Sequence, residues 1–594
     1  MKTETAFEVE LERNLSEQKF ETVLETLKNP ENDAYIETNM WNIINTVCLT
    51  LKTKDLIQNE DDVDSCRKIL LNLVDRGTPK EVIVALMEDA DSFKNHFHFS
   101  VLLEPLKKTL LKVPGKRGKS LEWVLSTLNA HIQTLPLPED ADLQGDEKML
   151  IDADPAVMDT NYVLTNYLKF MNTFVEEVSF ETLSKKEDFY ADRVAHQREI
   201  LQRFILILFY RPFLYQDLHV ESDSNRPKST IRTLCESYVK CLHKTCCNVF
   251  NLFKYEINPS KLSLKKKAKG DNNSSSKMED EIKDDNDDSE NVPTLAFANL
   301  SYLIFVENIG LDFQPLVYKH RYLFMKNLKY IILLLGKTQN LVLFKGLHLA
   351  QTLLDRLEEY EIAYNYIELG YFTEFPRLLM KVAIFSSIET HRKMALQVFL
   401  SYISKCDWKG RYHLINQVLC TTDHSGAEGL VISLYKTYLN DLLNGSVTDN
   451  YFLGKNLKLF LKKVYVLKKG VETDMLEESD RIMASLNFLR YLLIRDAKDK
   501  NVTGVWDLLP EISKRFLEPL STGLDLSRAH YKQVAKDYEE NARNKAKGSV
   551  NSTVTVNSEV LPNIPPQFQK DLFDKALLTF DMIESILSRV REFF

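Results

Sequence analysis

The sequence predicts an all-α fold. Apolar side chains recur at the 3.6-residue spacing of a helix along most of the chain, and no comparable run alternates with the two-residue period of a strand. Only 18 glycines and 18 prolines interrupt 594 residues, which favours long helices joined by short loops. Because single cores stop growing at roughly 250 to 300 residues, we expect two helical domains or one long solenoid.

The first clearly marked helices lie in the N-terminal half. Thr78, Pro79 and Glu81 supply a capping hydroxyl, a first-turn proline and an acidic third residue, so a helix is predicted to begin there. The segment 120–135 opens with a serine that can cap a run of apolar residues at helical spacing, and Pro136 ends it.

The pattern continues to the C-terminus, where apolar residues alternate four and three apart from Ala576 to Phe594. Similar windows cover residues 35–54, 60–76, 93–113, 155–210, 230–255, 295–335, 341–440 and 479–495. Helix after helix with one apolar stripe is typical of HEAT or armadillo-like solenoids, in which each helical pair buries its face on the next. Because no internal repeat can be aligned, we predict irregular repeats.

One charged segment divides the chain. From Lys261 it reads as a basic run, a Ser/Asn run and an acidic run with hardly any apolar residue, which cannot bury enough surface to offset the entropy of ordering. We therefore predict an N-terminal helical domain at residues 1–255, a disordered linker at 256–293 and a C-terminal HEAT-like domain at 294–594. The polar stretch at about 539–560 predicts a mobile loop inside the C-terminal domain.

Charge and cysteine usage exclude several classes of protein. The formal net charge of −9 argues against a nucleic-acid partner, which usually requires a basic domain or stripe. The chain opens without an apolar signal region, and its longest apolar stretches, Phe204–Phe209 and Tyr330–Leu335, fall short of the roughly 20 residues of a spanning helix. We expect eight reduced cysteines in a cytoplasmic protein, which also enters the nucleus if Lys265–Lys269 acts as an import signal.

No motif for catalysis survives inspection. Residues 114–120 (PGKRGKS) resemble a phosphate-binding loop, but Val113 stands where that motif needs glycine, and a basic turn between helices is the better interpretation. The Cys and His residues between Cys235 and Cys247 lack the Cys-x-x-Cys spacing of zinc sites and indicate buried thiols. We therefore predict no catalytic residue, no cofactor and no metal, and we expect that the protein is not an enzyme.

A lysine-rich stretch runs from Gly454 to Gly470 and carries six lysines beside apolar residues at helical spacing. Such a helix can lie on a membrane or meet an acidic protein. A solvated helix face with a buried apolar side is the interpretation that we favour.

The C-terminal half resembles a known family. The segments 471–496 (VETDMLEESDRIMASLNFLRYLLIRD), 503–531 (TGVWDLLPEISKRFLEPLSTGLDLSRAHY) and 561–590 (LPNIPPQFQKDLFDKALLTFDMIESILSRV) are similar to the glomulin family, as are 389–400 (ETHRKMALQVFL) and 423–432 (DHSGAEGLVI). The resemblance continues more thinly at 40–47 and 120–138 and fades in the charged segment.

This resemblance implies a function. It implies a HEAT-like protein whose C-terminal domain binds the RING subunit of cullin-RING ubiquitin ligases, together with the cullin, and masks the docking face for the ubiquitin-conjugating enzyme. Such an inhibitor needs a complementary surface and no reactive group. The family is also associated with immunophilins and with a receptor tyrosine kinase.

Candidate contact residues lie in these family-like segments. Large residues with directional hydrogen bonds are the usual interface anchors, and the six candidates are Lys436, Trp506, Arg515, Leu524, Arg528 and Tyr531. Core packing is the alternative for Trp506, Leu524 and Tyr531, and a solvated surface for the three basic residues. By contrast, Ile482, Leu486, Leu489 and Leu493 form a stripe that we predict to be core.

A second hypothesis needs no family resemblance. The chain can instead be a HEAT-type adaptor in receptor signalling or trafficking, with the Lys455–Lys469 face touching acidic partners or lipid. Retention of a cullin by the C-terminal half distinguishes the two hypotheses.

Overall fold

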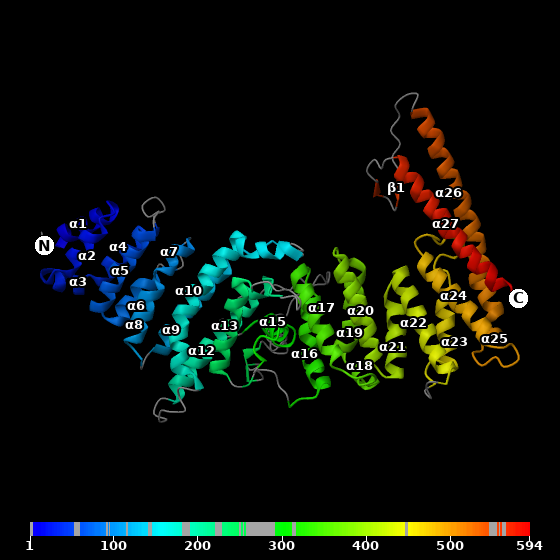
Figure 1. Cartoon of the computed structure of the whole chain (residues 1–594), viewed down its shortest axis with the longest axis horizontal. Coiled ribbons are helices and arrows are strands. Elements are labelled where there is room, and N and C mark those ends of the chain that lie inside the picture. The colour runs from blue at the N-terminus through cyan, green and yellow to red at the C-terminus, as the bar shows by residue number, and fades with distance from the viewer. Residues whose placement is uncertain are drawn as a thin grey trace, which may run out of the picture. The chain divides into compact units, whose positions relative to one another are not determined.

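The fold is known from a computed structural model. It describes the chain apart from residues 1–3, 53–59, 89, 91–92, 94, 115–116, 140–144, 181–190, 220–227, 247, 249–250, 253–254, 257–291, 312–316, 446–449, 546–554, 557–558, 561–565 and 594. The described residues form two compact units, Met1–Leu353 and Leu354–Phe594. In each unit consecutive helices lie side by side (Figure 1), which confirms the predicted all-α fold.

Unit 1 is built from helices throughout. They are α1 (Glu4–Ser16), α2 (Phe20–Lys28), η1 (Pro30–Asn32), α3 (Asp33–Thr38), α4 (Met40–Lys52), α5 (Glu60–Arg76), α6 (Pro79–Glu88), α7 (His96–Ser100), α8 (Leu103–Leu111), α9 (Arg117–Thr134), η3 (Gly145–Ala153), α10 (Pro155–Val178), α12 (Ala191–Tyr210), η4 (Phe213–Tyr215), α13 (Thr230–Thr245), α15 (Thr294–Phe305) and α16 (His320–Leu335), with α17 (Asn340–Asp355) at its end. The predicted start at Thr78 is present, and the Thr78 hydroxyl donates to Glu81 (2.6 Å).

Unit 2 continues the succession of helices. It contains α18 (Tyr364–Ile367), α19 (Gly370–Phe385), α20 (Glu389–Lys405), α21 (Trp408–Thr421), α22 (Ser425–Leu443), α23 (Lys455–Val464), η7 (Gly470–Glu472), α24 (Ser479–Arg495), α25 (Val505–Ile512), the π-helical η8 (Ser513–Leu517), α26 (Glu518–Lys545), the strands β1 (Thr555–Val556) and β2 (Glu559–Val560), and α27 (Pro566–Arg591). The predicted core stripe on α24 is buried at all four positions.

One local prediction differs from the structure. A mobile loop was predicted at about 539–560, but α26 runs through its first part to Lys545, and a pair of two-residue antiparallel strands, β1 and β2, lies in its last part. Residues 546–554 and 557–558 lie outside the described residues. Polar residues from Glu539 onward are compatible with a solvated helix, so their polarity alone did not mark a loop.

None of the helices in the described part of the chain combines the length and apolar character that crossing a membrane requires.

The chain divides later than the charged segment predicted. That segment, 257–291, lies outside the described residues, but the helices on its two sides pack together within unit 1. Asn299 of α15 donates to the Phe209 carbonyl of α12 (2.8 Å), and the fully buried Lys345 of α17 donates to the Phe213 and Leu214 carbonyls (2.8 Å each). These contacts join α15 and the first half of α17 to α12 and to the residues that follow it, within unit 1.

A buried carboxylate strengthens the same junction. Glu307 accepts hydrogen bonds from Arg232 of α13 (2.5 Å), His219 (2.8 Å) and Tyr302 (2.6 Å). Burial acts to raise the pKa of Glu307, but these donors outweigh it and lower the pKa to about 2. The carboxylate is therefore ionised, and it neutralises the buried guanidinium of Arg232.

Glu307→Gln is expected to destabilise unit 1 by ~3 kcal/mol at neutral pH, because the buried charge of Arg232 loses its buried counterion and keeps only the half-buried Glu236 (3.2 Å). The carboxyl has its ordinary pKa near 4.5 in the unfolded chain and about 2 in the folded chain. Its contribution is therefore complete above pH 4.5 and is lost as the pH falls from 4.5 through 2. Urea unfolding followed by hydrogen exchange in unit 1 measures both effects. The exposed Glu25→Gln on α2 is the control and should change the free energy by under ~0.5 kcal/mol.

Candidate protein-binding surface of the C-terminal unit

A buried network of charged side chains joins α22 and α24, two of the helices that support the candidate surface. Arg481 makes an ion pair through its Nε with Glu428 (2.5 Å), and Lys468 pairs with Glu428 (2.8 Å), Asp423 (2.5 Å) and Glu478 (3.1 Å). Burial raises the pKa of Glu428, while the hydrogen bond from Lys468 lowers the pKa of Asp423. The network fixes the order and spacing of these two helices.

Small residues allow the two helices to approach closely. A Cβ atom on Gly429 of α22 would lie 3.0 Å from the Asp480 carbonyl oxygen, so a larger residue would push α24 away. The Ser425 hydroxyl accepts the Arg481 backbone N–H (3.0 Å), and the His424 side chain accepts from Ala427 at the start of α22. The segment DHSGAEG therefore acts in helix packing.

A second buried carboxylate holds the turn between α24 and α25. Asp496 accepts from the backbone N–H groups of Val502 (2.9 Å) and Thr503 (2.7 Å) and from the Thr503 hydroxyl (2.6 Å). Its own carbonyl accepts the indole N–H of Trp506 (2.8 Å). This hydrogen bond holds Trp506 in a half-buried position. The Nζ atom of Lys498 lies 5.6 Å from the centre of the Trp506 ring.

Arg515 lies on the exposed side of the π-helical turn η8. In this turn the Glu518 N–H donates to the Ser513 carbonyl five residues back, whereas an α-helix uses the residue four back. Phe516 and Leu517 point into the core, and the half-exposed Arg515 side chain makes an ion pair with Glu511 (3.1 Å).

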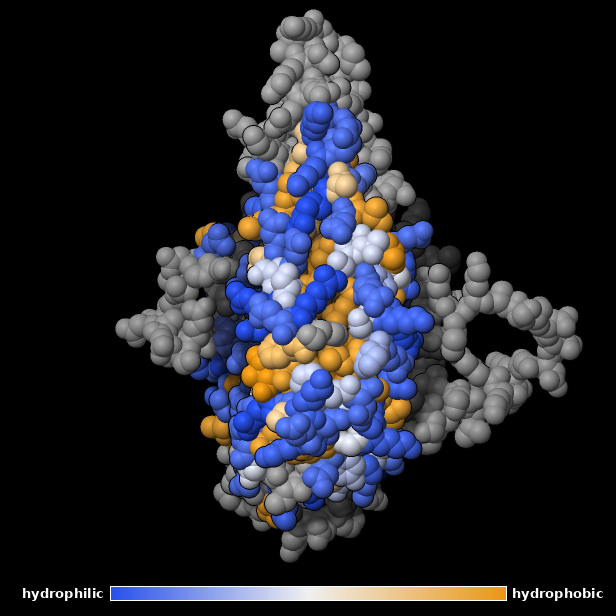
Figure 2. Space-filling model, turned by 90° about the vertical axis from the view of Figure 1, so that its right-hand side faces the viewer, coloured by the Kyte–Doolittle hydropathy of each residue, from blue (hydrophilic) through white to orange (hydrophobic). Residues whose placement is uncertain are grey.

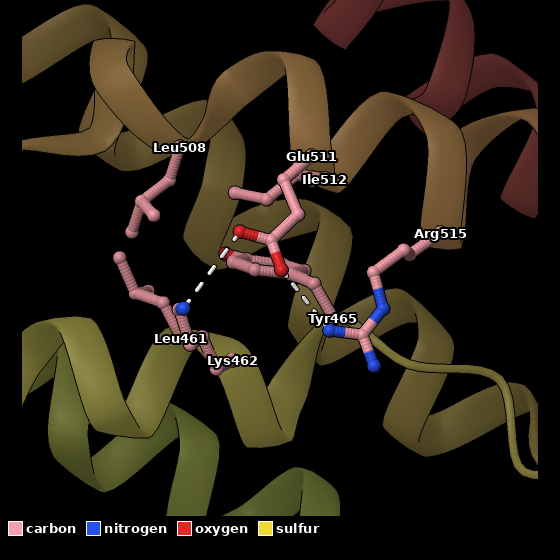
Figure 3. Close-up of a pocket in the computed structure, with 7 residues that line it drawn as sticks. All are labelled: Leu461, Lys462, Tyr465, Leu508, Glu511, Ile512 and Arg515. Carbon is pink, nitrogen blue, oxygen red and sulfur yellow. Dashed lines mark hydrogen bonds and ion pairs between the residues drawn. The ribbon is translucent and has the colours of Figure 1, made fainter.

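Arg515 also lies at the rim of a small pocket between α23 and α25. Figure 3 shows Glu511 between Lys462 and Arg515. The residues that line the pocket are Leu461, Lys462, Tyr465, Leu508, Glu511, Ile512 and Arg515. The Tyr465 side chain is 2% exposed, and its hydroxyl has no hydrogen-bond partner in the described part of the chain. The pocket is therefore an apolar hollow with a polar rim, and its lining includes the buried hydroxyl of Tyr465.

The three other candidates lie on α26, and two of them, Arg528 and Tyr531, contact α27. Leu524 is buried at 2% exposure. Arg528 pairs with both Asp581 (2.8 Å) and Glu584 (2.6 Å) of α27, and the Tyr531 ring contacts Phe580 edge-on with 5.4 Å between centroids. These contacts agree with the core alternative for Leu524 and leave Arg528 already neutralised.

Lys436 lies elsewhere in the unit, half-buried on α22, and forms no ion pair with any described residue. The structure therefore brings Trp506 and Arg515 to α25 and η8, and Leu524, Arg528 and Tyr531 to the α26–α27 pair. Figure 2 shows hydrophobic residues running in a band through the hydrophilic surface at this end of the chain.

The lysine-rich stretch is partly used in structure. Leu457, Phe460, Leu461 and Val464 bury one side of α23, and Lys468 after the helix belongs to the charge network. Sequence reasoning missed that network, because Glu428 lies 53 residues from Arg481 in the chain. It also missed the role of Asp496, although its partners Val502 and Thr503 are only six and seven residues away. The glycines in GAEG were the available signal, since helical glycines mark close packing.

The succession of helices, joined by buried ion pairs and hydrogen bonds, defines an all-α helical-repeat protein. A family model described as "Uncharacterised protein family, YAP/Alf4/glomulin" matches residues 3–562. The chain is similar to glomulin of Mus musculus, at 33% identity over 574 residues covering 96% of this chain and 90% of that protein. It is also similar to glomulin of Homo sapiens, at 31% identity over 599 residues covering 99% and 92%. The chain belongs to the glomulin family.

Arg481→Met is expected to destabilise unit 2 by ~3–5 kcal/mol, because it leaves Glu428 buried with only one of its two cationic partners. Chemical unfolding monitored by hydrogen exchange in α22 and α24 measures the loss. Arg377→Met, at an exposed arginine of α19, is the matched control and should stay within ~0.5 kcal/mol of the wild type. Equal effects of the two substitutions would contradict a structural role for the network.

Proposed function

We propose that this chain is a non-catalytic inhibitor of cullin-RING ubiquitin ligases, which binds the RING subunit through its C-terminal half and masks the docking face for the ubiquitin-conjugating enzyme. Membership of the glomulin family, at about a third identity over nearly the whole chain, is the observation that carries the proposal. The compartments in which such an inhibitor acts are the cytoplasm and the nucleus.

The architecture of unit 2 supports inhibition by occlusion. A competitor must present a preformed surface, because ordering a loose one on binding would consume part of the binding free energy. The Glu428–Arg481 pair and the Asp496 turn hold α22, α24 and α25 in fixed positions before any partner arrives. This rigidity supplies what occlusion needs without a reactive group.

Under this proposal the six candidates take two roles. Arg515 and Lys436 offer cationic groups to a partner, and Trp506 adds a fixed aromatic surface on α25. Arg and Trp are enriched among interface anchors. Arg528 and Tyr531 support this surface by holding α27 on α26, and the buried Leu524 belongs to the core of unit 2.

The adaptor hypothesis stays as the alternative. It predicts that the protein associates with a partner without changing the ligase, and the exposed lysines of α23 are the surface it would use. An assay of ubiquitin-chain formation separates the two functions, because only the inhibitor lowers the rate.

Full-length protein is expected to inhibit ubiquitin-chain formation by a purified cullin-RING ligase in a concentration-dependent way. The double variant Arg515→Glu, Lys436→Glu should raise the half-inhibitory concentration by about tenfold to thirtyfold, which corresponds to the loss of ~1.4–2 kcal/mol at interface anchors. Direct binding of the RING–cullin complex, measured by biolayer interferometry, should weaken in parallel.

Arg377→Glu, Lys240→Glu is the control, because it makes the same change of charge on α19 and α13. Inhibition that survives in the Arg515, Lys436 variant would move the contact surface elsewhere on the chain. If the folded wild-type protein leaves chain formation unchanged at any concentration, the inhibitor function fails and the adaptor function takes its place.

A further inference from the structure

One face of α16 in unit 1 carries an exposed aromatic and cationic stripe. Tyr322, Lys326 and Lys329 lie four and three residues apart along one side of α16, and Tyr318 comes two residues before the helix begins. The two tyrosine rings are stacked, with centroids 5.0 Å apart and planes at 20°. Lys326 lies with its Nζ 5.5 Å from the centre of the Tyr322 ring.

This stripe is unusually exposed for its composition. Tyr318 and Tyr322 are 41% and 39% exposed, and Val317 beside them is 94% exposed. Neither Lys319 nor Lys326 forms an ion pair with any described residue. Two uncompensated cations beside stacked rings, in a chain of net charge −9, are complementary to an acidic peptide.

The chain's own acidic run is tethered at the end of this stripe. Glu256 and Val292, which flank residues 257–291, pair with each other as an isolated β-bridge. The Glu256 carboxylate accepts from Lys329 at 2.7 and 2.8 Å. Both ends of the undescribed segment are therefore attached next to the stripe.

The distances permit the acidic run to reach the tyrosines. At 1.5 Å per residue, Lys329 and Tyr322 are roughly 10 Å apart along α16, and the Tyr318 ring stacks on Tyr322. The run Glu279–Glu290 contains eight carboxylates, and Asp284 near its middle is eight residues from Val292. Eight residues span at most about 27–29 Å, so the tether is long enough.

We propose that the Tyr318–Tyr322–Lys326 face of α16 is a binding site for the acidic run Glu279–Glu290 of the same chain. Each exposed ion pair contributes only ~0–1 kcal/mol in water. The tether compensates for this weakness, because short connections give effective concentrations in the millimolar range. The contact is electrostatic and weakens as salt rises.

A rival for the acidic run exists in the same segment. The basic run Lys265–Lys269 can pair with it, and such pairing would not involve α16. Substitutions on α16 distinguish the two arrangements.

The test measures how well an added acidic peptide competes with the internal one. The probe is a fluorescein-labelled peptide of residues 279–290, titrated with full-length protein at low salt and followed by anisotropy. We compare the wild type with an amide variant in which the eight carboxylates of the run are removed, E279Q, D280N, E281Q, D284N, D285N, D287N, D288N and E290Q. The amide variant is expected to bind the probe about tenfold more tightly, because its own run no longer occupies the site.

Two further variants test the location of the site. Adding Lys319→Glu and Lys326→Glu to the amide variant should remove the tenfold gain. Adding Lys28→Glu and Lys240→Glu, at exposed positions of α2 and α13, makes the same change of net charge and should preserve it.

The proposal is overturned if the amide variant binds the probe no more tightly than the wild type, or if the gain survives the α16 substitutions. Equal loss in the α16 and control variants would show binding by net charge alone, which also overturns it. Circular dichroism and the thermal midpoint of each variant verify that the helices are folded.

Discussion

The ion pair between Arg481 and Glu428 is the constraint on which the rest of unit 2 depends. It joins α22 to α24, and α24 is the helix on which both α25 and α27 pack. Hydrophobic burial alone would tolerate several rotations of two apolar helices, because it has no direction. A guanidinium paired with a buried carboxylate does not tolerate them, because a rotation that separates the two leaves both charges buried and unpaired. The network therefore selects one arrangement of the helices that carry the candidate surface.

Unit 1 also uses buried charged groups to join the helices on the two sides of the charged segment. Glu307 pairs with Arg232, and the Lys345 ammonium donates hydrogen bonds to the carbonyls of Phe213 and Leu214. Burial lowers the pKa of Lys345 to about 8, and the nearby Cys235, Asp217 and Glu307 oppose this shift. Helices separated by an insertion of more than thirty residues are thereby joined into one unit.

Periodicity predicted the all-α fold and the core stripe of α24, because burial of one helix face leaves a local pattern in the sequence. The position where the chain divides was not predictable in this way. It depends on pairs such as Arg232 with Glu307, which are 75 residues apart. The same limit applies to the candidate surface. Arg528 looked available in the sequence, but its partners Asp581 and Glu584 lie on another helix, and no local signal marks them.

The difference between Arg515 and Arg528 decides which arginine can serve a partner. Arg515 makes an ion pair with Glu511 four residues back on an exposed surface, and such a pair contributes only ~0.3–0.5 kcal/mol. Arg528 would have to give up two carboxylates and part of the α26–α27 contact to bind elsewhere. The π-helical turn places Arg515 on the surface, while the buried Phe516 and Leu517 hold the same turn in the core. An arginine that is fixed in place and weakly paired loses little on exchanging its partner, which is the property that a competitive binding surface requires.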